Sequence, residues 1–316
     1  MKKLFCFTVL AASLVQSLVS HAAANSEYVS GLSYGKQARL PEITSLAIGK
    51  DGFLVVAAGD KVFIFDPSKE ESVRSFDPGF KGISAVAVEG ETIYVFSKKT
   101  GVKELENNGR KFKIQVPIGA LCKKFSWDGT LIGDLDLQGL KDVVNAKVVA
   151  GKIYAADFGG THKVQVFDAK TGSPLASIGK DLRLCCGLLD FAVDPKTGDV
   201  LIGNMGAFLL ERYSPTGEIK FAFGKRGPDM QDFQGCCNPV SAAVLPDGNL
   251  VVVEKDPSRV KTYTPQGKLV FPFADLQSLT KGCDRVAVVA DPKGRIYLGV
   301  NNAASQHFVL QYVPKS

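Results

Sequence analysis

Apolar and polar residues alternate in short runs along most of this chain, and turns containing glycine separate the runs. Residues 241–253 (SAAVLPDGNLVVV) show the arrangement: an apolar run, an Asp-Gly-Asn turn and a second apolar run. Alternation with a period of two predicts half-buried β-strands, and Asp-Gly or Asn-Gly pairs predict tight turns. Nowhere does a helical period continue beyond a turn or two. The pattern therefore predicts an all-β protein.

One unit, consisting of an apolar strand, a glycine turn and a second strand, recurs six times. The turn glycines are separated by 38, 61, 47, 50 and 46 residues. Such spacing is typical of the four-stranded blades of a β-propeller, which repeat every 40 to 50 residues or so. Most units continue into a third and a fourth strand. We therefore expect a six-bladed β-propeller, with turn glycines at Gly52, Gly90, Gly151, Gly198, Gly248 and Gly294.

The two ends of the chain predict how the ring closes. The last unit stops after its third strand, while a spare strand-like segment, residues 27–34 (EYVSGLSY), precedes the first unit. We expect this segment to complete the last blade, because the ring then has no open sheet edge. The 61-residue interval is expected to hold an insertion over about residues 118–141.

The first 24 residues have the pattern of an export signal. Lys2 and Lys3 precede an apolar stretch over residues 4–19 and the small-residue run Ala22-Ala23-Ala24. This stretch is too short and wrongly flanked for a permanent membrane span. We expect cleavage after Ala24, leaving residues 25–316 as a single domain that is periplasmic or secreted and has no membrane span.

Charge limits the partners that the sequence predicts. Without Lys2 and Lys3 the formal net charge falls from +6 to +4, and no block of five or six like charges occurs. Nucleic acid and anionic membranes are therefore not predicted as partners. We expect a monomer that binds a protein or redox partner.

One segment of the chain, in the fourth and fifth repeats, resembles a known repeat family. Residues 221–273 (FAFGKRGPDMQDFQGCCNPVSAAVLPDGNLVVVEKDPSRVKTYTPQGKLVFPF) resemble the NHL repeat, with its Phe-Gly lead, a proline before the inner strand, an Asp-Gly-Asn turn and Arg259-Val260 opening the third strand. The run Gly235 to Pro239 looks like that of a subgroup of exported bacterial NHL proteins. The resemblance implies a propeller fold. NHL proteins serve as scaffolds, ligand receivers or enzymes, so function has to come from a site.

Cysteines carry the least ordinary chemistry of residues 25–316. Cys186, Cys237 and Cys283 each lie nine residues before a proline that precedes a turn glycine, so they occupy equivalent positions in blades 4, 5 and 6. We expect the three thiols to lie around one arc of the channel mouth and to bind a metal, with His307 or Cys122 as a fourth ligand. Soft sulfur and imidazole ligands suit zinc, copper or an iron–sulfur cluster.

Two alternatives to a metal site remain open. Six cysteines are an even number in an exported chain, which favours three disulfides in a binding scaffold without a cofactor. Side chains alternate along an extended chain, so Cys185 and Cys236 are expected to face away from their neighbours, toward a blade interface, and are the candidates for a disulfide. The second alternative is a lactonase- or lyase-like enzyme with oxygen ligands from Glu42, Asn204, Asp256 and Asn301. No hydrolase, protease or nucleotide motif is present, and we do not expect turnover.

Overall fold

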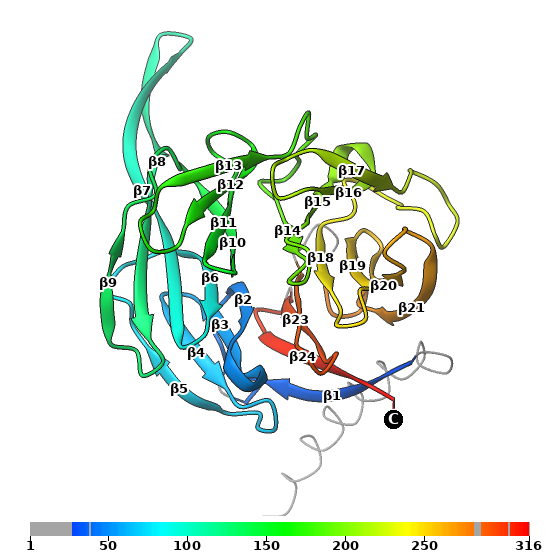
Figure 1. The fold of residues 1–316 in the computed structure, drawn as a ribbon. Helices are drawn as coiled ribbons and strands as arrows, with labels where there is room; N and C mark the ends of the chain where they lie inside the picture. Colours follow the sequence, from blue (N-terminus) through cyan, green and yellow to red (C-terminus); the bar gives the residue numbers. More distant parts are fainter. Residues whose placement is uncertain (1–26, 38, 281–285, 303, 316) are drawn as a thin grey trace, which may run out of the picture.

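A computed structural model of the chain describes residues 27–37, 39–280, 286–302 and 304–315. These residues form six four-stranded antiparallel sheets arranged as blades around a central channel (Figure 1). The innermost strands of successive blades contact one another around the whole circle, and the last of them, β22, contacts the first, β2. The predicted six-bladed β-propeller is confirmed.

The first three blades are built from consecutive strands, innermost first. They comprise β2 (Ile43–Ile48), β3 (Leu54–Ala58), β4 (Lys61–Phe65) and β5 (Ser72–Phe76) in blade 1; β6 (Ile83–Glu89), β7 (Thr92–Asn107), β8 (Arg110–Ser126) and β9 (Leu131–Leu135) in blade 2; and β10 (Val143–Val149), β11 (Lys152–Asp157), β12 (Lys163–Asp168) and β13 (Pro174–Ile178) in blade 3.

The last three blades repeat this order, except that the outermost strand of blade 6 comes from the other end of the chain. They comprise β14 (Phe191–Val193), β15 (Val200–Asn204), β16 (Leu209–Tyr213) and β17 (Ile219–Phe223) in blade 4; β18 (Ser241–Val244), β19 (Leu250–Lys255), β20 (Ser258–Tyr263) and β21 (Leu269–Asp275) in blade 5; and β22 (Ala287–Ala290), β23 (Ile296–Asn301), β24 (His307–Pro314) and β1 (Tyr28–Tyr34) in blade 6. Two single-turn 3₁₀ segments, η2 (Lys50–Gly52) and η3 (Met205–Ala207), lie in connections.

The six turn glycines mark the turns between first and second strands, as the repeat predicted. All six have positive φ, between 60° and 91°, a region that glycine enters without steric cost. The sheets of neighbouring blades pack face to face. Buried aliphatic and aromatic side chains fill the spaces between neighbouring blades.

Blade 6 closes as predicted. β1 pairs antiparallel with β24, from Tyr28 opposite Pro314 to Tyr34 opposite Val309. Tyr34 is completely buried, and its hydroxyl donates a hydrogen bond of 2.8 Å to the carbonyl of Pro67 in blade 1. The N-terminal strand therefore joins the last blade to the first.

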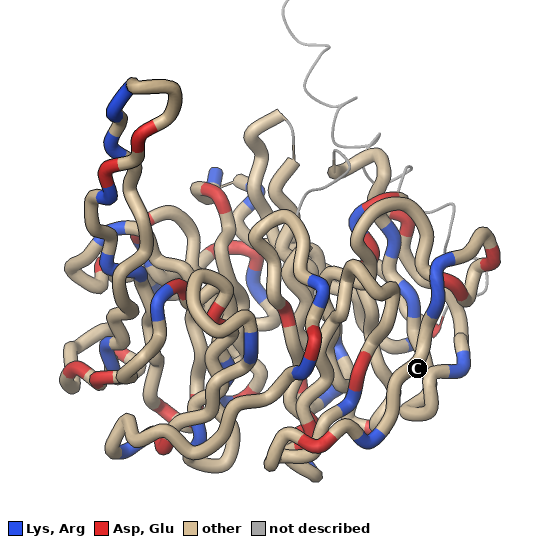
Figure 2. Tube along the Cα trace, turned by 90° about the horizontal axis from the view of Figure 1, so that it is seen from above, with Lys and Arg blue, Asp and Glu red and all other residues tan. Residues whose placement is uncertain are grey.

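The extra length of blade 2 lies in a different place from the expected insertion. Residues 118–126 belong to β8, and β9 completes the same sheet, so most of the range 118–141 is ordinary blade. The additional residues extend the β7–β8 hairpin instead, and residues 98–120 form an arm that stands clear of the disc (Figures 1 and 2). Asn108 and Gly109, both with positive φ, form the turn at its tip. Asn-Gly is the strongest short-range hairpin signal, and it marks this turn in the sequence.

Two predictions, the export signal and the position of Cys283, concern residues that the structure does not describe. Residues 1–24, the expected export signal, lie outside the described part, as does Cys283. Among the residues that the structure describes, no helix is long and apolar enough to cross a membrane.

Candidate functional site

Equivalent cysteines of blades 4 and 5 share an unusual backbone conformation. Cys185 to Leu188 form a tight turn, closed by a 3.1 Å hydrogen bond from the Leu188 amide to the Cys185 carbonyl. Cys186 and Gly187 occupy its centre with φ of 57° and 71°. Cys237 also has a positive φ, of 59°. The left-handed region costs a residue with a side chain about 1 kcal/mol or more, and such strain often marks a functional site.

Buried polar contacts fix the loop that carries Cys237. Asn238 is fully buried, and its amide nitrogen donates to the carbonyls of Gln234 and Asp256, at 2.7 and 2.9 Å. Its amide oxygen accepts a hydrogen bond of 2.9 Å from the backbone of Lys255. At Gly235 a Cβ would lie 2.0 Å from the Asp256 carbonyl, so only glycine fits. The Gly-Cys-Cys-Asn-Pro run thus holds its cysteines against the β19–β20 turn.

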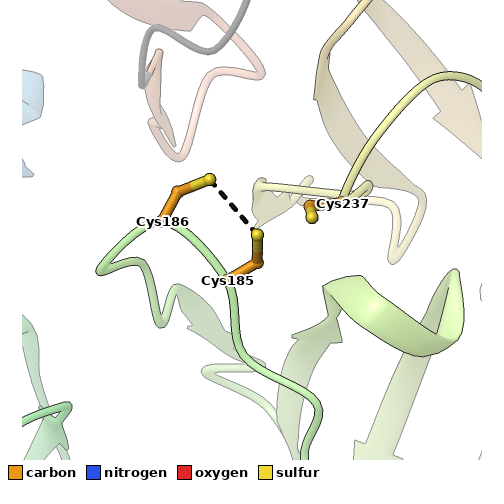
Figure 3. Close-up of side chains that lie close together, drawn as sticks. All are labelled: Cys185, Cys186 and Cys237. Atoms are coloured by element: carbon orange, nitrogen blue, oxygen red, sulfur yellow. Dashed lines mark hydrogen bonds between the residues drawn. The ribbon is translucent and has the colours of Figure 1, made fainter.

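Sulfur atoms from the two blades meet between these loops. The Sγ atoms of Cys185, Cys186 and Cys237 all lie within 4.8 Å of one another, and we call these residues the cysteine cluster (Figure 3). Adjacent sulfurs are close but not bonded: 3.2 Å for Cys185 and Cys186, and 3.0 Å for Cys236 and Cys237. The expectation that Cys185 and Cys236 face away from the cysteines that follow them is therefore wrong. Alternation holds for extended backbone, whereas Cys186 turns the chain through the left-handed region.

A buried lysine sets the charge of the cluster. The Lys255 ammonium lies 3.0 Å from the Cys186 sulfur and holds the pKa of that thiol below its usual range. At Cys185 the hydrogen bond with Cys237 favours the thiolate, but the bond with Cys186 and burial outweigh it and raise the pKa. Burial, followed by the hydrogen bond with Cys185, raises the pKa of Cys237. The first thiolate of the metal-free cluster is therefore expected at Cys186.

Alkylation of the metal-free protein should show this difference. In a Cys185→Ser background, Lys255→Met should slow iodoacetamide labelling of Cys186 severalfold at pH 7, because the thiolate is the nucleophile and loses its cation. The difference should vanish above pH ~9, where an ordinary thiol is itself ionised. Mass spectrometry of the labelled peptides measures both rates, and exposed Cys236 is the internal reference. Equal rates at Cys186 with and without Lys255 would contradict the assignment.

A buried charge network supports the same loop from behind. Glu254 is fully buried on β19 and accepts a hydrogen bond of 3.2 Å from the Gln234 amide, immediately before the Gly-Cys-Cys run. Arg259 donates to both oxygens of this carboxylate, each at 3.0 Å, and Lys261 donates to one of them. No pattern in the sequence indicates this network, because Arg259 matches the repeat and stands out in no other way.

The fourth ligands suggested by the sequence are not part of the cluster. Cys122 lies in β8 opposite Phe96, where it is 3% exposed in the core between blades 2 and 3. Burial raises the pKa of its thiol to about 12. Its misplacement follows from the misplaced insertion. Whether Cys283 completes the arc stays a prediction.

His307 lies elsewhere, at the start of β24. Its Nδ1 is 3.0 Å from the side-chain oxygen of Asn301, and the imidazole lines a separate cavity of about 300 Å³ with Lys36 and Arg39. Among the described His, Cys, Asp and Glu residues, the cysteine cluster is the group whose ligand atoms lie close enough to share an ion.

Two of the four candidate oxygen ligands for an enzyme, Asn204 and Asn301, are engaged in structural hydrogen bonds, whereas Glu42 and Asp256 are exposed. Asn204 donates to Glu211 at 2.8 Å and accepts from the Arg183 amide at 2.8 Å. Asn301 donates to and accepts from the backbone of Ile43, at 2.8 and 2.9 Å. These contacts join Asn204 to the next strand and to the loop before blade 4, and join Asn301 of blade 6 to blade 1.

The channel holds a cavity at the other ends of the inner strands, away from the cysteines. Its volume is about 480 Å³, and small apolar residues line most of it, among them Ala47, Ala87, Ala242 and Val288. Among the residues that the structure describes, no cysteine or histidine lines this cavity, so the cysteine cluster and the apolar cavity are separate features.

Neither a scan against protein-family models nor a search of curated proteins gives a match to the chain. The chemistry of the site therefore has to be judged from its own atoms. Three sulfurs on anchored loops, one of them beside a lysine, can bind a thiophilic metal or exchange electrons as thiols.

Proposed function

We propose that this protein is an exported, NHL-type β-propeller that binds one soft metal ion through Cys185, Cys186 and Cys237. The observation that carries the proposal is the meeting of three sulfurs within 4.8 Å from two successive blades. Sulfur ligands of a single zinc ion are separated by about 3.5 to 4 Å, so small side-chain rotations suffice. The exported, NHL-type character rests on residues 1–24 and on the repeat resemblance of residues 221–273.

Zinc and copper(I) fit the cluster best. Thiolates select soft ions, and three thiolates around a divalent ion leave one negative charge. Lys255, with its ammonium 3.0 Å from the Cys186 sulfur, compensates for that charge. Cys186 is exposed, so an ion held here can be reached by a metal-donating or redox partner.

The metal content of the purified protein tests the proposal directly. Protein purified anaerobically and reduced should retain about one zinc or copper(I) ion per chain after desalting, measured by elemental mass spectrometry. Cys237→Ser should abolish this retention, because it removes one of three ligands. Lys255→Met should weaken it by about 10- to 100-fold, as expected when a neighbour that supports a ligand is lost.

A matched control separates ligation from general damage. Cys122→Ala removes a buried cysteine of blade 2 and should leave the metal content unchanged. Visible absorbance together with stoichiometric iron and sulfide would show that the site holds an iron–sulfur cluster instead of a single ion. Retention of metal by Cys237→Ser at the wild-type level would rule out this site.

The second candidate is a scaffold in which adjacent cysteines are oxidised. The 3.2 and 3.0 Å separations of the Cys185–Cys186 and Cys236–Cys237 sulfurs favour it, because the sulfurs of each pair already face one another. A bond between consecutive cysteines would be strained, since their Cα atoms are only about 3.8 Å apart. Peptide mapping of protein purified in air, without reductant, distinguishes the two. Disulfides within both pairs, together with failure of the reduced protein to take up metal, would establish the scaffold.

A further inference from the structure

The arm of blade 2 concentrates the charge of the chain. Residues 98–120 contain six Lys and Arg against two Glu, a net charge of +4. Residues 25–316 together carry the same +4, so the remainder of the disc sums to zero. The basic residues are interrupted by Glu104, Glu106 and the turn, so they do not form a run in the sequence. The hairpin brings them together on one protruding element (Figure 2).

The strand register separates the arm into two different faces. Directly paired residues share a face, so Leu105 opposite Phe112 and Lys103 opposite Ile114 lie on one side. Val116, opposite Gly101, and Arg110, opposite Asn107, lie on this side too. A Cβ at Gly101 would meet the Ile118 side chain at 2.8 Å, so Ile118 also covers this face. We call this set the apolar face.

The opposite face is mainly polar and charged, although it also carries Val102, which lies opposite Gln115 and is 61% exposed. It carries both carboxylates of the arm, Glu104 and Glu106, which pair in register with Lys113 and Lys111. Lys111 also lies 3.4 Å from Glu104. All the acidic groups of the arm are therefore on this second face, and the apolar face has cations and no carboxylate.

No other part of the described chain covers the apolar face. Phe112 is 43% exposed and Ile118 is 61% exposed, and neither packs into the core of blade 2. A two-stranded ribbon without a second layer is only marginally stable in water. The arm thus exposes apolar side chains to water on the face that also carries Lys103 and Arg110. This exposure costs free energy, which a partner surface covering the face can offset.

We propose that the apolar face of the arm docks on the surface of an anionic lipid bilayer. Basic residues attract the arm to acidic headgroups, and aromatic and aliphatic side chains on the same face enter the boundary with the acyl chains. A second copy of the chain is disfavoured as the partner, because two arms of net charge +4 repel each other. The tip itself, Asn107 to Arg110, is polar, so the ribbon lies along the surface instead of inserting end-on.

Vesicle sedimentation tests the proposal with the metal-free protein, so its outcome is independent of the cysteine cluster. The protein should sediment with vesicles of equal parts phosphatidylglycerol and phosphatidylcholine at low ionic strength, and not with phosphatidylcholine alone. Lys103→Gln with Arg110→Gln should weaken partitioning about 30-fold, at about fivefold for each basic residue at the surface. Phe112→Ser with Ile118→Ser should weaken it about tenfold or more.

A charge-matched pair on the other face is the decisive control. Lys111→Gln with Lys113→Gln lowers the net charge by the same amount but leaves the apolar face intact, so its effect should be clearly smaller. All these side chains lie on the exposed arm, and circular dichroism should show unchanged folding. Absence of sedimentation with anionic vesicles, or equal losses for the two charge pairs, would overturn the proposal and leave an acidic protein as the alternative partner.

Discussion

Removal of residues 25–35 should lower the thermal unfolding midpoint of the protein by about 10 °C or more. The deletion takes away β1, which closes the ring. Tyr34 is fully buried, with its ring 5.6 Å from that of Phe65 in blade 1. Tyr28 is 7% exposed and lies 5.3 Å from Phe273 in blade 5. Loss of one such aromatic side chain costs about 3 to 5 kcal/mol.

Point variants on the same strand give the matched comparison. Tyr34→Ala should reproduce a large part of the loss, because it leaves a cavity between blades 6 and 1. Val29→Ala should have little effect, since Val29 is 42% exposed on the outer side of the strand. Calorimetry of residues 25–316 and 36–316 measures the midpoints. A truncated protein that unfolds at the same temperature as residues 25–316 would show that ring closure does not depend on β1.

Ring closure could be predicted from the sequence because it depends on strand number, which the repeat reveals. The final unit has one strand too few and the N-terminal segment has one to spare. The nine-residue spacing between a cysteine and the proline before the turn glycine depends on the repeat in the same way. It placed Cys186 and Cys237 at equivalent positions, and their sulfurs lie within 4.8 Å of each other.

Predictions that needed local backbone conformation failed. The direction of Cys185 depends on the positive φ of Cys186, which a rule for extended strands ignores. Cys122 was misplaced because the Asn108-Gly109 turn was not recognised as the end of a long hairpin. Lys255 could not be assigned a role, because its partner Cys186 lies in a loop that only the packing of blade 4 on blade 5 brings near it. The anchoring role of Glu254 was missed because its contact with the Gln234 amide depends on the path of the β17–β18 connection.

Glu254→Gln should destabilise the protein by about 3 to 5 kcal/mol, as expected when one member of a buried ion network is neutralised. Arg259 and Lys261 would then keep buried charges without their counter-ion. Lys261 also donates hydrogen bonds of 2.9 Å to the carbonyls of Met230 and Asp232. Burial already lowers its pKa, in spite of the opposing effect of Glu254. Its ammonium lies 5.0 Å from the ring centre of Phe233, which cannot replace a carboxylate.

The comparison is an exposed ion pair of similar length. Lys50 and Glu91 lie 2.8 Å apart with both side chains more than half exposed, so Glu91→Gln should leave the denaturation midpoint essentially unchanged. Urea unfolding of both variants measures the difference. An effect of Glu254→Gln as small as that of Glu91→Gln would contradict the expected role of the network.

The same substitution links stability to the cysteine cluster. Glu254 accepts the Gln234 amide and so anchors the residue before Gly235. When this anchor weakens, the loop that carries Cys237 gains freedom, and the metal pays a larger entropy cost to order it. Glu254→Gln should therefore weaken zinc or copper(I) binding under conditions where the protein is still folded, whereas Glu91→Gln should not. Equal metal affinity in the two folded variants would show that the network stabilises blade 5 without positioning Cys237.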